Sequence, residues 1–166
     1  MASTAKAHLE ILDITSSAFG NGQRIPVEHT KDGSDHSPAL EWSKIPAATR
    51  SLAMICDDPD APREDPWVHW VIYNMPATLR SIPERVSPSE RPAEVPGASQ
   101  GKNDFGDLGY GGPQPPHGHG THHYHFKLFA LDTTLDLPPG ATKKELLDAI
   151  KGHVRATGEI VGTYSR

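Results

Sequence analysis

The chain has 166 residues, a formal charge of −5 and a mean hydropathy of −0.52. Its 16 Lys and Arg side chains are scattered, which argues against nucleic acid as a partner, and no stretch approaches the roughly 20 apolar residues of a membrane-spanning helix. The length predicts one domain over residues 1–166, because one core suffices at this size, with residues 1–7 expected to be flexible. The first residues contain no apolar run resembling a signal peptide, so we expect a cytoplasmic protein.

Sixteen prolines and fifteen glycines favour short strands and shaped loops over a helical bundle. In chain order, the patterns predict strands at 8–14, 24–29, 40–42 and 51–56. The last of these is a continuous apolar run that ends at the carboxylates of Asp57, Asp58 and Asp60. The single cysteine, Cys56, lies within the same run and excludes an internal disulfide.

The segment from Trp67 to Met75 is aromatic and β-branched on both faces, which predicts a central strand covered on both sides. Strict alternation would place His69 on one face with Val71, Tyr73 and Met75, and we expect His69 to be buried. Residues 76–120 are rich in proline and show little periodicity. A loop of this length inside one domain is usually functional or disordered.

A glycine- and proline-rich loop and a strand meet at residues 110–132. From His122 onward a period of two predicts two faces. One carries His122, Tyr124, Phe126, Leu128 and Ala130, and the other carries His123, His125, Lys127 and Phe129. Two polar side chains at the mouth of an otherwise apolar face, directly after a glycine-rich loop, indicate a small-ligand site.

One amphipathic helix is predicted near the C-terminus. Thr142 and Glu145 have the spacing of a capping box, and Leu146, Ile150 and Val154 recur every four residues. Gly158 is expected to end this helix, and residues 159–164 to return as a short strand. The fold class predicted from these patterns is therefore mainly β.

Two motifs carry a resemblance to a known family. The first is Asp58-Pro59-Asp60-Ala61-Pro62 followed by Trp67-Val68-His69-Trp70, and the second runs from Gly112-Pro113-Gln114-Pro115-Pro116 to Gly118-His119-Gly120-Thr121-His122-His123-Tyr124. With them, the chain resembles the phosphatidylethanolamine-binding protein family, or Raf kinase inhibitor-like proteins, over nearly its whole length. Residues 101–106 and 158–164 resemble the bacterial and archaeal branch.

The resemblance implies an antiparallel β-sandwich with one or two short helices and a small pocket for phosphate-like anions. The ligand-binding residues that it implies are Asp58, His69, Pro116, His122 and Tyr124, with Asp60, Trp67 and the backbone from Gly118 to Gly120 lining or supporting them. It also implies a kinase-like protein partner. No cofactor is expected, and the exposed loop 83–96 is a candidate surface for a homodimer.

Two positions depart from the family pattern. Gln114 stands where many prokaryotic members have Cys, and His123 stands where the family commonly has Arg. Without that Arg the site has one permanent charge fewer, which predicts a different anion affinity or different partner contacts.

The residues themselves support an anion site. His69 and His122 can donate N–H bonds, Tyr124 can add an O–H, and glycine amides can form a concave nest. Asp58 would accept a histidine N–H and fix its tautomer, or meet the amine of a zwitterion such as phosphoethanolamine. Either role predicts weaker binding as the pH rises past the histidine pKa.

Two other functions stay open. The five histidines His117, His119, His122, His123 and His125 could capture a metal ion, but a strand divides them between two faces, so we expect no designed metal site. Asp58 with His69 or His122 resembles two-thirds of a nucleophilic triad, as in a hydrolase. Because no Gly-x-Ser-x-Gly elbow is present and Cys56 lies in an apolar run, a binding module is preferred to an enzyme.

Overall fold

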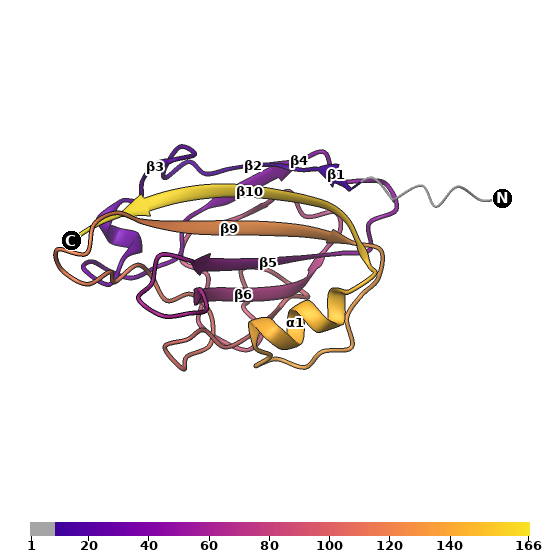
Figure 1. Cartoon of the computed structure of the whole chain (residues 1–166). Coiled ribbons are helices and arrows are strands. Elements are labelled where there is room, and N and C mark those ends of the chain that lie inside the picture. The colour runs from indigo at the N-terminus through magenta and orange to yellow at the C-terminus, as the bar shows by residue number, and fades with distance from the viewer. Residues whose placement is uncertain (1–8) are drawn as a thin grey trace.

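The computed structural model describes residues 9–166, which form two β-sheets and one short helix (Figure 1). The large sheet has seven strands in the order β1-β10-β9-β5-β6-β8, with β3 also paired to β10, and the small sheet has the order β2-β4-β7. The prediction that residues 1–7 are flexible falls outside the described residues. The assignment of one domain to residues 1–166 stays a prediction.

The strands differ greatly in length, and the longest ones build the large sheet. Their bounds are β1 Glu10–Ile11, β2 Asp13–Thr15, β3 Gln23–Arg24, β4 Leu40–Ser43, β5 Ser51–Asp58, β6 Trp67–Pro76, β7 Ser81–Ile82, β8 Ser99–Gln100, β9 His122–Leu131 and β10 Val154–Tyr164. A 3₁₀ helix, η1, spans Val27–His29, and α1 spans Lys143–Ile150. The fold is mainly β, as predicted, although β1 and β3 pair with β10 in the parallel direction.

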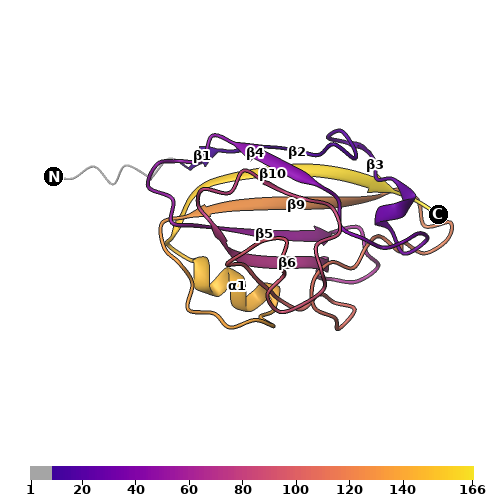
Figure 2. The same cartoon turned by 180° about the vertical axis from the view of Figure 1, so that it is seen from behind.

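Two apolar clusters cover the two faces of the large sheet. The first lies between the sheets and includes Trp42 of β4, Leu52 of β5 and Phe126 of β9. The second packs Leu146 and Ile150 of α1 against the opposite face, where α1 lies in Figures 1 and 2. All eight residues of β5 are buried because this strand is covered on both sides. On β9 the predicted inward residues, from His122 to Ala130, are likewise buried at every second position.

Three predicted boundaries near the chain ends are wrong. The helix keeps its predicted capping box at Thr142 and Glu145 but ends at Ile150, and Val154 begins β10. A turn through Gly152, with φ of +80°, separates them, and β10 then pairs with β9 along its whole length, a ladder that local helical periodicity does not register. The prediction of a strand at 24–29 is correct only for Arg24, because η1 follows Pro26.

The predicted strand at 8–14 is divided between the two sheets. β1 pairs with β10 of the large sheet, whereas β2 pairs with β4 of the small one. Leu12 lies between them and is buried in the core. One short segment therefore bridges both layers, which a single strand pattern does not predict.

A β-bulge in β6 changes the direction of His69. Cys56 of β5 pairs with Trp70, but the next residue, Asp57, pairs with Val68, so His69 is the extra residue. Val68 and Val71 therefore pack in the cluster beneath α1, whereas Trp70 packs between the sheets. The His69 ring lies 5.1 Å from that of Tyr124, which also packs between the sheets, so the prediction that His69 shares a face with Val71 and Tyr73 is wrong. Bulges re-aim side chains in this way next to binding sites.

Candidate functional site

A pocket of about 320 Å³ is lined by residues at one end of the large sheet. Figure 1 shows this end of the sheet on the left, where the arrows of β5 and β10 finish. At this end β5 and β10 finish while β6 and β9 begin, so one end of each of these four neighbouring strands lies there. The residues that line the pocket are Asp58, Ala61, Pro62, Trp67, His69, Phe105, Gln114, Pro115, Pro116, His122 and Tyr124.

The pocket brings together most of the candidate residues from the sequence. Asp58, Trp67, His69, Pro116, His122 and Tyr124 line it, whereas Asp60, Gly118 and Gly120 do not. Sequence reasoning missed five lining residues, and four of them lie inside the motifs quoted above: Ala61, Pro62, Phe105, Gln114 and Pro115. Phe105 comes from the long irregular loop, and only tertiary contact shows its role.

Asp58 and His122 form the buried polar floor. The Oδ2 atom of Asp58 lies 2.6 Å from Nδ1 of His122, and both residues are almost fully buried. Oδ1 of Asp58 accepts a hydrogen bond from the backbone N–H of Asp60, at 2.8 Å. Because a carboxylate only accepts, His122 carries its proton on Nδ1, and the Nε2 atom of the neutral ring holds a lone pair.

His119 forms a hydrogen bond with that second nitrogen, Nε2 of His122. Its Nδ1 lies 2.7 Å from Nε2 of His122, so His119 donates when His122 is neutral. The glycines on either side, Gly118 and Gly120, have φ of +75° and +95°, a conformation that side chains disfavour and that shapes this turn. Gly118 and Gly120 do not line the pocket, and the turn between them presents His119 to His122. His122 then has no free N–H for a ligand while His119 stays in place.

The side chain of His69 is held by the loop between β8 and β9. Its Nδ1 donates to the backbone carbonyl oxygen of Gly111, at 2.6 Å, which leaves Nε2 as the nitrogen that meets a ligand. Burial lowers the pKa of His69 below its ordinary value, more than the Gly111 bond and the charge of Asp58 raise it. Neutral His69 thus presents a lone pair, and protonated His69 presents an N–H donor.

Tyr124 and two aromatic walls complete the pocket. Burial, followed by the charge of Asp58, raises the pKa of Tyr124, so this side chain stays a phenol that can donate its O–H. The rings of Trp67 and Phe105 meet edge to face at 5.3 Å. A Cβ added to Gly111 would lie 2.6 Å from the Phe105 ring, so the absence of a side chain at Gly111 allows this ring to pack against the backbone.

The remaining predicted residues and the two family departures lie in different places. Asp60 accepts from the backbone N–H and the Nδ1 of His123, at 2.8 and 2.7 Å, outside the pocket. His123, which stands where the family commonly has Arg, is therefore engaged on the outer side of β9. Gln114, the other departure, is exposed and lines the pocket mouth.

The five clustered histidines do not converge. His119 and His122 pair with each other, His123 pairs with Asp60, and His125 lies 3.2 Å from Glu159. Cys56 is buried within β5, and burial raises the pKa of its thiol. That environment makes a thiol inert rather than nucleophilic.

The comparisons with known proteins show the family of the chain. The profile of the phosphatidylethanolamine-binding protein family matches residues 15–165. A UPF0098 protein, PH1269 of Pyrococcus horikoshii, is 49% identical over 152 residues, which cover 91% of this chain and 75% of that protein. A UPF0098 protein of Methanothermobacter thermautotrophicus is 46% identical over 155 residues, covering 93% and 99%.

A solved structure matches as well. The crystal structure of E. coli YbcL, described as a new member of the mammalian PEBP family, has a TM-score of 0.87 and 34% sequence identity, with 93% of this chain and 98% of that chain covered. Among residues 9–166 no helix is long and apolar enough to cross a membrane.

Proposed function

Because the chain belongs to the phosphatidylethanolamine-binding protein family, in its prokaryotic branch, we propose that its pocket binds a small phosphorylated or otherwise anionic ligand. The observation that carries this proposal is the convergence of His69, His122 and Tyr124 on one cavity with aromatic and proline walls. A few polar groups within a mainly apolar cavity are typical of small-molecule sites.

The size of the cavity favours a headgroup-sized ligand. Its volume of about 320 Å³ is at the lower end of the range for ligand pockets, roughly 300 to 1,000 Å³. A phosphate ester or a phosphoethanolamine group fits this space, whereas the two acyl chains of a lipid would extend past the mouth near Gln114.

Three donors would hold the anion. Tyr124 offers its O–H, protonated His69 offers Nε2–H, and His122 offers Nε2–H once it is protonated and released from His119. The Asp58 carboxylate lines the same cavity and would attract the ammonium group of a zwitterion. Phosphoethanolamine is therefore expected to bind more tightly than inorganic phosphate.

The test is an NMR titration of the full chain with O-phosphoethanolamine and with inorganic phosphate, read at the backbone amides. Saturable shifts confined to residues 58–69, 105 and 111–124 support the proposal. The variant Tyr124→Phe removes only the hydroxyl and should weaken binding. The control, Tyr73→Phe, removes a hydroxyl on the opposite face of the sheet, where it donates to the Pro138 carbonyl oxygen. Equal effects of the two variants, or shifts outside the pocket, would refute the proposal.

The titration tests ligand binding and leaves the finer predictions as they were. Regulation of a kinase-like partner, a homodimer through loop 83–96 and a cytoplasmic location stay predictions. A phosphate or carboxyl ester that is converted during the titration, rather than only bound, would favour the hydrolase alternative over the binding module.

A further inference from the structure

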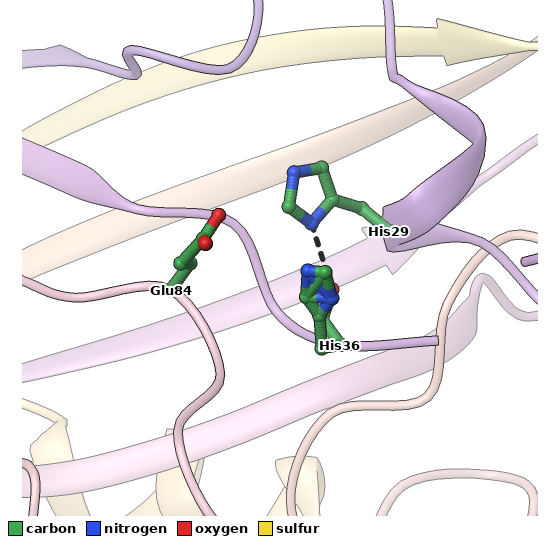
Figure 3. Close-up of side chains that lie close together, drawn as sticks. All are labelled: His29, His36 and Glu84. Atoms are coloured by element: carbon green, nitrogen blue, oxygen red, sulfur yellow. Dashed lines mark hydrogen bonds between the residues drawn. The ribbon is translucent and has the colours of Figure 1, made fainter. Parts of the chain in front are cut away.

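A second cluster of ionisable side chains lies apart from the ligand pocket, where three segments meet (Figure 3). It contains His29 at the end of η1, His36 in the loop before β4, and Glu84 in the loop after β7. One ligand atom from each residue lies within 4.8 Å of the others. None of the three residues lines the pocket described above.

His29 is oriented as a metal-binding histidine. Its Nδ1 lies 2.8 Å from the backbone carbonyl oxygen of His36, the dashed line in Figure 3, and must carry the proton because a carbonyl only accepts. Nε2 therefore bears a lone pair, and it is buried with no hydrogen-bond partner. In metal sites, the ring nitrogen that does not bind the metal usually donates to a carbonyl or a carboxylate in this way.

His36 adds two more unpartnered nitrogens. Of the five buried side-chain N and O atoms that lack a partner among residues 9–166, three are His29 Nε2, His36 Nδ1 and His36 Nε2. The two rings meet edge to face, with centroids 4.7 Å apart. A neutral His36 ring carries one N–H and one lone pair, so the two rings together offer two lone pairs, one of them on His29 Nε2. Buried polar atoms without partners are costly, and two such lone pairs in one cluster indicate a missing partner that accepts them.

The partner is expected to be positively charged, since carboxylates surround the same point. The half-exposed Glu84 side chain lies beside the two rings (Figure 3), and Oε1 of Glu28 lies 3.6 Å from His29 Nε2. A lone pair and a carboxylate that face each other at this distance are both stabilised by a cation between them.

We propose that His29, His36 and Glu84 bind a divalent transition-metal ion of the Zn²⁺ class, with the Glu28 carboxylate placed to supply a fourth ligand. Tetrahedral ligands with bonds of roughly 2.1 Å lie roughly 3.4 Å apart, so atoms of the cluster that are 4.8 Å apart have to approach by roughly 1.4 Å. Glu28 and Glu84 are both exposed enough to make this movement. Arg85, whose Nε lies 4.0 Å from Glu84 Oε1, is 71% exposed and can turn into solvent.

The donor set selects the class of metal. Two imidazoles and carboxylates suit Zn²⁺, Co²⁺ and Ni²⁺, whereas Ca²⁺ and Mg²⁺ prefer oxygen ligands alone. Such an ion would link residues 28–36 to residue 84. Residues 28–36 also contact the loop beside the ligand pocket, because the His29 carbonyl oxygen accepts the Tyr110 O–H at 2.6 Å. Tyr110 immediately precedes Gly111, whose carbonyl oxygen accepts the hydrogen bond from His69.

The experiment uses the full chain after treatment with EDTA. Zn²⁺ is titrated in competition with a chromophoric chelator, and Co²⁺ is titrated with detection of its visible absorption. One equivalent of Zn²⁺ should bind, Ca²⁺ and Mg²⁺ should not compete, and Zn²⁺ should raise the Tm. Glu84→Gln and His36→Gln should each weaken Zn²⁺ binding by at least about tenfold and abolish the rise in Tm.

Matched controls separate this site from its rivals. Glu90→Gln changes an exposed carboxylate in the same loop and should leave Zn²⁺ affinity unchanged. The triple variant His117→Gln, His119→Gln, His123→Gln removes three of the clustered surface histidines and should also leave it unchanged. In wild type, Zn²⁺ should shift the ¹⁵N resonance of His29 Nε2 while the Nδ1 proton is retained.

Three results would overturn the proposal. One is the absence of stoichiometric Zn²⁺ binding by wild type, which would mean that water or a proton satisfies the two rings. Another is Zn²⁺ binding that survives in both Glu84→Gln and His36→Gln. The third is Zn²⁺ binding that disappears in the triple variant. Glu84 is half-exposed, so Glu84→Gln is expected to keep the wild-type amide spectrum, and the result is then readable without a folding defect.

Discussion

The Nδ1 atom of His119 lies 2.7 Å from Nε2 of His122, whose own Nδ1 lies 2.6 Å from the carboxylate of Asp58. This chain of hydrogen bonds runs from an exposed loop to a buried strand end. His122 and Asp58 are buried, whereas His119 is exposed and makes its contact from the turn between Gly118 and Gly120. An exposed side chain therefore competes with any ligand for the one nitrogen of His122 that Asp58 does not use.

Replacing His119 by Ala should strengthen anion binding. The variant frees Nε2 of His122, so the protonated ring can donate to the anion without first breaking the existing hydrogen bond, which contributes about 0.5 to 1.5 kcal/mol. The affinity for O-phosphoethanolamine should rise roughly twofold to tenfold, as measured by the amide titration at fixed pH and salt.

His117→Ala is the matched control, because His117 is exposed in the same loop and does not contact His122. It should change the affinity little. If His119→Ala weakens binding, His119 is itself a ligand contact rather than a competitor.

Replacing Asp58 by Asn should reverse the tautomer of His122. The Asn oxygen can still accept from the N–H of Asp60, but its amide group then donates to His122 Nδ1, so the imidazole proton moves to Nε2. The charge-assisted bond becomes a neutral one, which should lower the free energy of unfolding by about 1 to 2 kcal/mol. Imidazole ¹⁵N chemical shifts report the tautomer, and urea unfolding reports the stability.

Asp60→Asn provides the comparison for Asp58→Asn. Asp60 binds His123 on the solvent side, where both side chains are at least 40% exposed, so its loss should cost less than about 1 kcal/mol. A tautomer of His122 that is unchanged in Asp58→Asn would contradict the assignment of Asp58 as the residue that fixes it.

His69 should make stability depend on pH in the acidic range. Burial lowers its pKa in the folded chain, so below the unfolded value of about 6.5 the unfolded state binds more protons. The free energy of unfolding should therefore fall as the pH decreases from about 6.5 toward the folded pKa, and level off above about 6.5. Urea unfolding across this range measures the slope, which His69→Gln should reduce.

Some slope should persist in His69→Gln, since burial also lowers the pKa of His36 and acts with the same sign. The exposed His117→Gln should keep the wild-type slope. An anion in the pocket should act in the opposite direction, because it favours protonated His69, so phosphate should bind more tightly as the pH falls. Equal slopes in wild type and His69→Gln would contradict a buried, neutral His69.

Local sequence pattern was sufficient to predict a strand or helix where the element buries its residues at a regular period. The inward face of β9 from His122 to Ala130, the buried run of β5 and the capping box at Thr142 were all predictable, because period and side-chain chemistry act within a few residues. The end of the helix was not predictable, because β10 gains its backbone partners from β9, more than twenty residues earlier in the chain.

The candidate site shows the same division. Local motifs were enough to predict which residue types gather near the pocket, since Asp58, His69, Pro116, His122 and Tyr124 stand in motifs near the ends of strands. The direction in which each side chain faces depends on contacts between distant segments. The bulge at His69 depends on the pairing of β6 with β5, and the blocking of His122 by His119 depends on how the glycine turn folds back. The cluster of His29, His36 and Glu84 likewise joins residues nearly fifty positions apart, because loops that are unrelated in local pattern are brought together by the packing of two sheets.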